Sequence, residues 1–258
     1  MRCSRLAWSL TLVGAMVVLA GCGGGGTVST TPTAVATPYS SANAVAFAGP
    51  VTDSVLGSGT FTIAYTQSGS TVNGTWGMVY TTSEWLNGGS FTGTLAAGTL
   101  SGTAVSDTDG ECNLTVSATL GGTTSMSGSY VATGCSDTDT ATFTATAFTI
   151  PTVGTYSGTV TNSLVPAGGT MSLTLTQYNV YLTGSYSDAF ATAPGYNNSN
   201  GLAYGIVTGP SSISYYLLTP STNPGCPLIL NGTLSGGVVA GSYVSQACTL
   251  NETGTFNL

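Results

Sequence analysis

The feature that most constrains the fold of this chain is an internal repeat. Residues 128–143 read GSYVATGCSDTDTATF and residues 241–256 read GSYVSQACTLNETGTF, so one tetrapeptide, a cysteine, an acid and a Thr-Phe pair recur at matched spacing. Upstream, the segment at 49–76 aligns with the segment at 158–186. Because each copy is about 105 residues long, the repeat predicts two tandem domains and not a short-repeat solenoid.

Within each copy, apolar and polar residues alternate. Phe61, Ile63 and Tyr65 interleave with threonines, and the second copy has the same pattern around Leu173. Alternation with a period of two, rich in Thr and broken by Gly and Asn, is typical of β-strands. No segment after residue 22 keeps a helical period. The first copy contains eight candidate strands, near 45–52, 59–67, 71–80, 90–95, 99–106, 112–120, 125–133 and 140–148.

Short turns between these strands predict an antiparallel meander, and an eight-stranded meander removes its exposed edges by closing into a barrel. Gly154-Thr-Tyr followed by Leu182-Thr-Gly-Ser-Tyr resembles the pattern of avidin, although the ligand-binding residues of that family do not map onto this chain. The predicted fold class is all-β, with two tandem up-and-down barrels of the lipocalin or avidin kind at 44–150 and 151–258. A β-sandwich is the alternative.

The N-terminus has the features of an export signal. MRCSR is followed by an apolar run at residues 6–20 that is short for a membrane span, which is typical of a signal peptide. Leu19-Ala20-Gly21-Cys22 resembles the lipobox of bacterial lipoproteins. The resemblance implies cleavage after residues 1–21 and acylation of the Cys22 thiol, for example by palmitate. An ordinary secretory signal with an incidental cysteine is the alternative.

Residues 22–43 are mostly Gly, Ser, Thr and Pro, which predicts a flexible linker behind the lipidated cysteine. The membrane is then a partner through the N-terminal lipid. We expect the mature protein in the bacterial cell envelope, lipid-anchored and extracytoplasmic, at the outer membrane or the cell surface. A barrel that itself spans the outer membrane is a minor alternative, disfavoured by the predicted disulfides and short loops.

The mature chain is unusual in its charge. Both cationic residues, Arg2 and Arg5, lie in the signal peptide, and the whole sequence has no His, so the nine acids of residues 22–258 have no counterpart. Without cations to neutralise phosphates, nucleic-acid binding is excluded in any ordinary form. Without His or Lys, Ser-His-Asp catalysis, Schiff bases and His-ligated metals are excluded too. We therefore expect a protein that is not an enzyme, with a carboxylate-only enzyme as the last alternative.

Four cysteines remain after the lipidation site, two in each copy. In an antiparallel hairpin the facing residues have a constant sum of positions, and both pairs centre on Gly-rich turns. An even cysteine number in an exported chain favours oxidation. We predict the disulfides Cys112–Cys135 and Cys226–Cys248; free or metal-bound thiols are the alternative.

Acids crowd around the first cysteine pair only. The five acids within five residues of it are Asp107, Asp109, Glu111, Asp137 and Asp139, while the second copy has Glu252 alone near its pair. Carboxylates without nearby cations repel one another, and a hard cation that takes oxygen ligands offsets that repulsion. The pattern makes these five residues a candidate calcium site. A solvated acidic rim is the alternative.

Aromatic residues in predicted loops give a second candidate. Phe190 and Tyr196 lie in a long connection of the second copy, and Trp85 lies in the matching place of the first. Exposed rings with polar neighbours stack on sugars, whereas rings that fold back cover the mouth of a barrel. Two functions remain open: a binding module for a small apolar ligand or a surface glycan, and a structural or adhesive surface protein whose barrels are filled.

Overall fold

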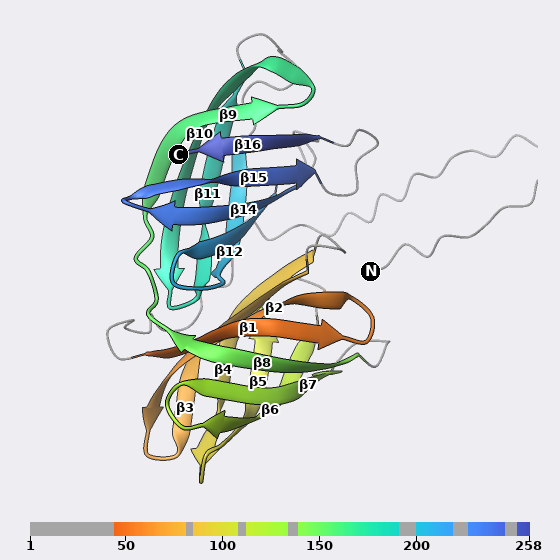
Figure 1. Cartoon of the computed structure of the whole chain (residues 1–258), viewed down its shortest axis with the longest axis vertical. Coiled ribbons are helices and arrows are strands. Elements are labelled where there is room, and N and C mark those ends of the chain that lie inside the picture. The colour runs from red at the N-terminus through yellow and green to blue at the C-terminus, as the bar shows by residue number, and fades with distance from the viewer. Residues whose placement is uncertain are drawn as a thin grey trace, which may run out of the picture. The chain divides into compact units, whose positions relative to one another are not determined.

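A computed structural model gives the fold of the protein and describes residues 44–80, 85–107, 112–133, 139–190, 200–218, 227–245 and 252–258. The predicted signal peptide and linker, residues 1–43, lie outside the described residues. Every regular element within these described ranges is a β-strand (Figure 1). Among the described residues, no helix is long and apolar enough to cross a membrane.

Sixteen strands form two closed antiparallel barrels, each a meander in which every strand pairs with its neighbours in sequence. The predicted fold class is confirmed. The first barrel consists of β1 (Val45–Asp53), β2 (Gly57–Ser68), β3 (Thr71–Tyr80), β4 (Trp85–Ala96), β5 (Thr99–Ser106), β6 (Asn113–Gly121), β7 (Ser125–Thr133) and β8 (Thr140–Phe148). The second consists of β9 (Thr155–Asn162), β10 (Val165–Tyr178), β11 (Tyr181–Ala189), β12 (Asn200–Val207), β13 (Ser212–Leu218), β14 (Leu228–Ser235), β15 (Val238–Ser245) and β16 (Thr253–Asn257).

Seven of the eight strands expected in the first copy agree with the structure to within two residues at either end. The exception is β4, which begins at Trp85 and not near residue 90. Asn87-Gly88-Gly89 has the composition of a turn, but here it lies inside the strand and pairs with Met78, Gly77 and Trp76 of β3. A turn signal in the sequence is overridden by the ladder with β3.

The repeat of the sequence is also a repeat of backbone packing. Gly74 of β3 and Gly184 of β11 are aligned, and a Cβ at either position would overlap a carbonyl oxygen of the preceding strand, Ala64 or Thr174. Only glycine allows these strands to approach so closely. The two copies therefore conserve a shape of the barrel wall and not only a hydrophobic pattern.

The interior of each barrel is filled by side chains. In the first barrel Phe47, Phe61, Ile63, Trp76 and Phe91 have an exposed fraction of 0%. The rings of Phe61 and Phe143 stack with their centroids 4.4 Å apart. The core of the second barrel includes Leu173, Tyr215, Leu230 and Tyr243, all buried. Inward-pointing residues alternate with exposed Ser and Thr along β6, β8 and β10.

Candidate functional site

One end of the first barrel has a buried polar cluster in place of apolar packing. Asp53, the last residue of β1, points into the barrel and has an exposed fraction of 4%. Its Oδ1 accepts hydrogen bonds from the backbone N–H groups of Val55 and Leu56, at 2.8 and 2.7 Å. Its Oδ2 accepts from the hydroxyls of Tyr130 and Tyr80. The carboxylate thus fixes the β1–β2 turn and gives partners to two buried tyrosines.

A second carboxyl group completes this cluster. Asp139 lies directly before β8, and its carboxylate accepts a hydrogen bond from the Ser54 hydroxyl at 2.8 Å and interacts electrostatically with Asp53. Burial would raise the pKa of Asp53, but the hydrogen bonds from Leu56, Tyr130 and Val55 outweigh it and hold that pKa below its ordinary value. Burial and the neighbouring Asp53 charge raise the pKa of Asp139.

The second barrel has a similar cluster in which both acids of the first barrel are replaced. Asn162 stands where the first barrel has Asp53, and its Oδ1 accepts from the Leu164 N–H at 2.8 Å. Its Nδ2 donates to Glu252, the equivalent of Asp139, and the Tyr243 hydroxyl lies 3.3 Å from the same carboxylate oxygen. An amide and one acid thus replace the two acids of the first barrel.

The central groups of these clusters are buried, whereas Asp139 is half-buried. Asp53, Asn162 and Glu252 have exposed fractions of 4, 5 and 9%. Each group bonds to a turn or to a tyrosine across the barrel, so the clusters tie the ends of the first and last strands together. We assign them a structural role. One feature of the sequence pointed to these clusters, because Asp139 and Glu252 align in the repeat. The sequence analysis did not predict that Asp53 and its tyrosine partners belong to them.

The predicted calcium residues are only partly described. Asp107 and Asp139 are placed by the structure, whereas Asp109, Glu111 and Asp137 lie outside the described residues. Asp139 bonds to Asp53 and Ser54, and burial raises the pKa of Asp107 to about 6. Among the described residues, no group of three or more potential metal ligands is found. A calcium site at this end of the barrel stays a prediction.

The hairpins that carry the cysteines have the predicted turns. Asn113 pairs with Thr133 and Leu228 pairs with Ser245, so both hairpin centres lie within half a residue of the centres predicted from the cysteine positions. Cys112 is disulfide-bonded. Cys135, Cys226 and Cys248 lie outside the described residues, so the two pairings stay predictions.

Of the three aromatic residues predicted to contact a ligand, the structure describes the side chain of Phe190 alone. Phe190, expected as an exposed ring for sugars, has an exposed fraction of 3% and packs in the core of the second barrel. That interpretation of Phe190 is wrong, and the alternative of a ring folded back over the barrel is what the structure has. The reason is that Gly169 of β10 leaves room beside the ring, since a Cβ there would press on Phe190. Tyr196 and the side chain of Trp85 lie outside the described residues.

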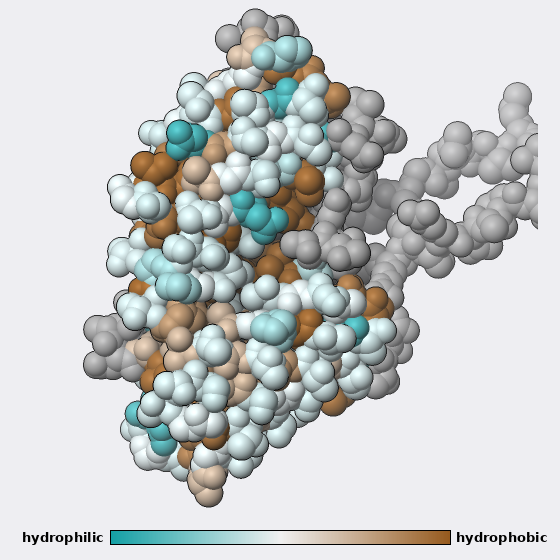
Figure 2. All heavy atoms as spheres, viewed as in Figure 1, coloured by the Kyte–Doolittle hydropathy of each residue, from teal (hydrophilic) through white to brown (hydrophobic). Residues whose placement is uncertain are grey.

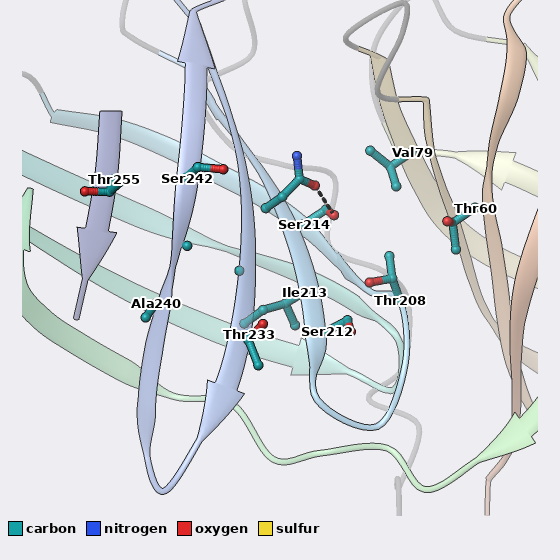
Figure 3. A pocket seen from close by; sticks show the side chains of 13 residues that line it. Thr60, Val79, Thr208, Ser212, Ile213, Ser214, Thr233, Ala240, Ser242 and Thr255 are labelled. Atoms are coloured by element: carbon teal, nitrogen blue, oxygen red, sulfur yellow. Dashed lines mark hydrogen bonds between the residues drawn. The ribbon is translucent and has the colours of Figure 1, made fainter. Parts of the chain in front are cut away.

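A groove not expected from the sequence lies on the outer face of the second barrel (Figure 3). Its volume is about 550 Å³, and Thr60 of β2 and Val79 of β3 form the wall opposite β13–β16. Seven of the lining residues carry hydroxyl groups: Thr60, Thr208, Ser212, Ser214, Thr233, Ser242 and Thr255. None of the lining residues is charged. The groove therefore presents neutral hydrogen-bonding groups.

The wall of the groove is held by packing between the two barrels. Val79 is buried in a small apolar cluster with Leu86, Tyr181 and Ile206. Nearby, the Thr75 hydroxyl donates to the Tyr178 carbonyl at 2.8 Å. An apolar contact and a part-buried hydrogen bond thus join the two barrels beside the groove.

Comparison with known proteins gives little further information. No protein-family model matches the chain, and a search of curated proteins finds no match. One solved structure is similar to it: a crystal structure of a putative outer membrane protein from Bacteroides fragilis, with 13% identity over 83% of this chain and 96% of the other. The TM-score is 0.29, so this likeness carries no argument.

Proposed function

We propose that the protein is a lipid-anchored envelope protein that acts through the outer surface of two filled barrels. In this proposal it is a structural or adhesive surface protein, and not an enzyme or a carrier. The observation that carries this proposal is the filled interior. An eight-stranded barrel is wide enough either to be filled by side chains or to hold one small ligand. In the first barrel, Phe47, Phe61, Trp76 and Phe91 take up that space and are wholly buried.

The composition of the surface supports the same proposal. Most residues on the face in Figure 2 have intermediate hydropathy, as expected for a surface of Ser, Thr and Gly. The mature chain has nine acids and no cation, so contacts with anionic partners are unfavourable. Neutral hydroxyls leave hydrogen bonding and shape as the means of contact.

The anchor rests on the lipobox-like Leu19-Ala20-Gly21-Cys22. Acyl chains on Cys22 would hold the protein at a membrane, since each buried CH₂ contributes about 0.8 kcal/mol. The Gly-rich segment after it would leave the barrels free to meet partners outside the membrane.

Two measurements test the proposal. First, cells are grown with labelled palmitate, and we expect label on the wild-type protein, recovery of that protein with membranes, and neither for Cys22→Ser. Label on Cys22→Ser would contradict the anchor. Second, the purified mature protein is titrated with the apolar fluorescent probe N-phenylnaphthylamine. We expect no saturable binding, and one probe bound per barrel would contradict the filled interior.

A further inference from the structure

We propose that the groove on β13–β16 binds a neutral, hydroxyl-rich glycan segment. This inference deepens the adhesive function proposed above and rests on it. It assigns a surface different from the loop rings considered in the sequence, one of which, Phe190, is buried.

The first argument is an oriented hydrogen-bond donor. Ser214 of β13 is 4% exposed, and its hydroxyl donates to Oδ1 of Asn231 on β14 at 2.7 Å. This bond fixes the orientation of the amide, which lines the groove. No acceptor for its NH₂ group is found among the described residues. A half-buried amide with two unused donors matches a ligand rich in oxygen acceptors.

The second argument is the comparison with the first barrel. In the strand registers, Ser101 and Ser117 of β5 and β6 occupy the places of Ser214 and Asn231, and both are exposed on an open face. In the second barrel the serine is buried, its neighbour is an amide, and Thr60 and Val79 form an opposite wall. The same strand surface has thus become a concave site in one copy only.

The third argument concerns the class of ligand. A volume of about 550 Å³ lies within the range of about 300–1,000 Å³ typical of small-ligand pockets. Sugars present both donors and acceptors, as the serine and threonine hydroxyls of the groove do. Because the mature chain is acidic and the lining is uncharged, acidic glycans are excluded by repulsion.

The test uses the purified mature protein and two panels of trisaccharides of equal length. One panel consists of neutral glucose, mannose and N-acetylglucosamine oligomers, and the other consists of uronic acid oligomers. Binding is measured by calorimetry, and the site is located by amide chemical-shift changes. We expect at least one neutral oligomer to bind with shifts on β13–β16, and the acidic oligomers to bind at least tenfold more weakly.

Two variants alter the groove, and a third variant is a matched control outside it. Ala240→Trp fills the groove from an exposed position on β15, and Asn231→Leu removes the oriented donor. Ser127→Trp makes the same change at the aligned exposed position of β7 in the first barrel. We expect each groove variant to weaken binding at least tenfold and Ser127→Trp to leave it within twofold.

Any one of several results would overturn the assignment. They are failure of every neutral oligomer to bind, equal binding by the wild-type protein and Ala240→Trp, and shifts that map to another surface. Binding of an extended peptide in place of every sugar would also overturn it. None of these results depends on the apolar-probe titration, which tests the filled interior by itself.

Discussion

Replacement of Asp53 by Ala or by Asn separates two roles of one buried carboxylate. In the first barrel this group accepts hydrogen bonds from two backbone N–H groups of the β1–β2 turn and from the Tyr130 hydroxyl. The second barrel shows how an amide is accommodated at the same place, because Asn162 keeps the turn bond to Leu164 and donates to the neighbouring acid. The two substitutions should therefore differ sharply in cost.

The magnitudes follow from the partners left without a bond. The hydroxyls of Tyr80 and Tyr130 lie 2.8 Å apart and can bond to each other, so Asp53→Ala leaves one buried O–H of this pair without its acceptor, at a cost of about 1–3 kcal/mol. It also removes the two turn bonds, each worth about 0.5–1.5 kcal/mol. Allowing for relaxation of the turn, we expect a loss of about 2–4 kcal/mol. Asp53→Asn keeps an oxygen for the turn and offers an NH₂ group to Asp139, so we expect a loss of about 1 kcal/mol or less.

The assay is guanidinium unfolding followed by tryptophan fluorescence. Once the signal peptide is removed, the tryptophans of the chain are Trp76 and Trp85, both in the first barrel, so the signal reports this barrel alone. Asn162→Ala is a control, because it damages only the other barrel and should leave this transition in place. Equal losses for Asp53→Ala and Asp53→Asn, or a loss below about 0.5 kcal/mol for Asp53→Ala, would refute the reasoning.

Three further predictions concern stability. Tyr215→Phe should be neutral or stabilising, because the buried Tyr215 hydroxyl has no partner among the described residues. Tyr243→Phe should cost about 1 kcal/mol, because it removes the 2.8 Å hydrogen bond from the Tyr243 hydroxyl to a backbone carbonyl, and thermal unfolding of both variants tests the pair of predictions. Burial raises the pKa of Asp107 to about 6, so the folded state holds the Asp107 proton more tightly than the unfolded chain does. The melting temperature should therefore fall as pH rises from about 4 to 6. Asp107→Asn should make this fall smaller, and an unchanged slope of melting temperature against pH would contradict the prediction. Peptide mapping without reduction should recover Cys112 joined to Cys135, a bridge worth about 3 kcal/mol by loop closure, and any other partner of Cys112 would show the pairing to be wrong.

Much of the fold could be predicted from the sequence because its signals are local. A strand such as β8 shows its period of two within nine residues, and its burial alternates as the sequence alternates. Turns such as the one at Gly69 are also local, since this residue has a φ of 62° and the aligned Asn179 has a φ of 53°. Closure of each barrel then followed from the number of strands and from the cost of open edges.

The sites were harder to predict from the sequence, because they bring together residues that are far apart in the chain. Asp53 and Tyr130 are 77 residues apart, and no local pattern marks either as a member of a buried cluster. The groove depends on Thr60 and Val79 facing β13–β16, a contact that neither copy of the repeat predicts by itself. Phe190 was misinterpreted because a loop-like sequence around it does not reveal the space that Gly169 leaves for its ring.

The measurement that most directly tests the central claim, that the barrels are filled and the outer surface acts, is native mass spectrometry of the mature protein purified unreduced from an envelope fraction. We predict a mass equal to that of the acylated chain with two disulfides and nothing further bound inside. The claim would be contradicted by an additional organic mass that survives purification and is released only on unfolding. Such a mass would place a ligand in an interior that Trp76, Phe61 and their neighbours are expected to occupy fully.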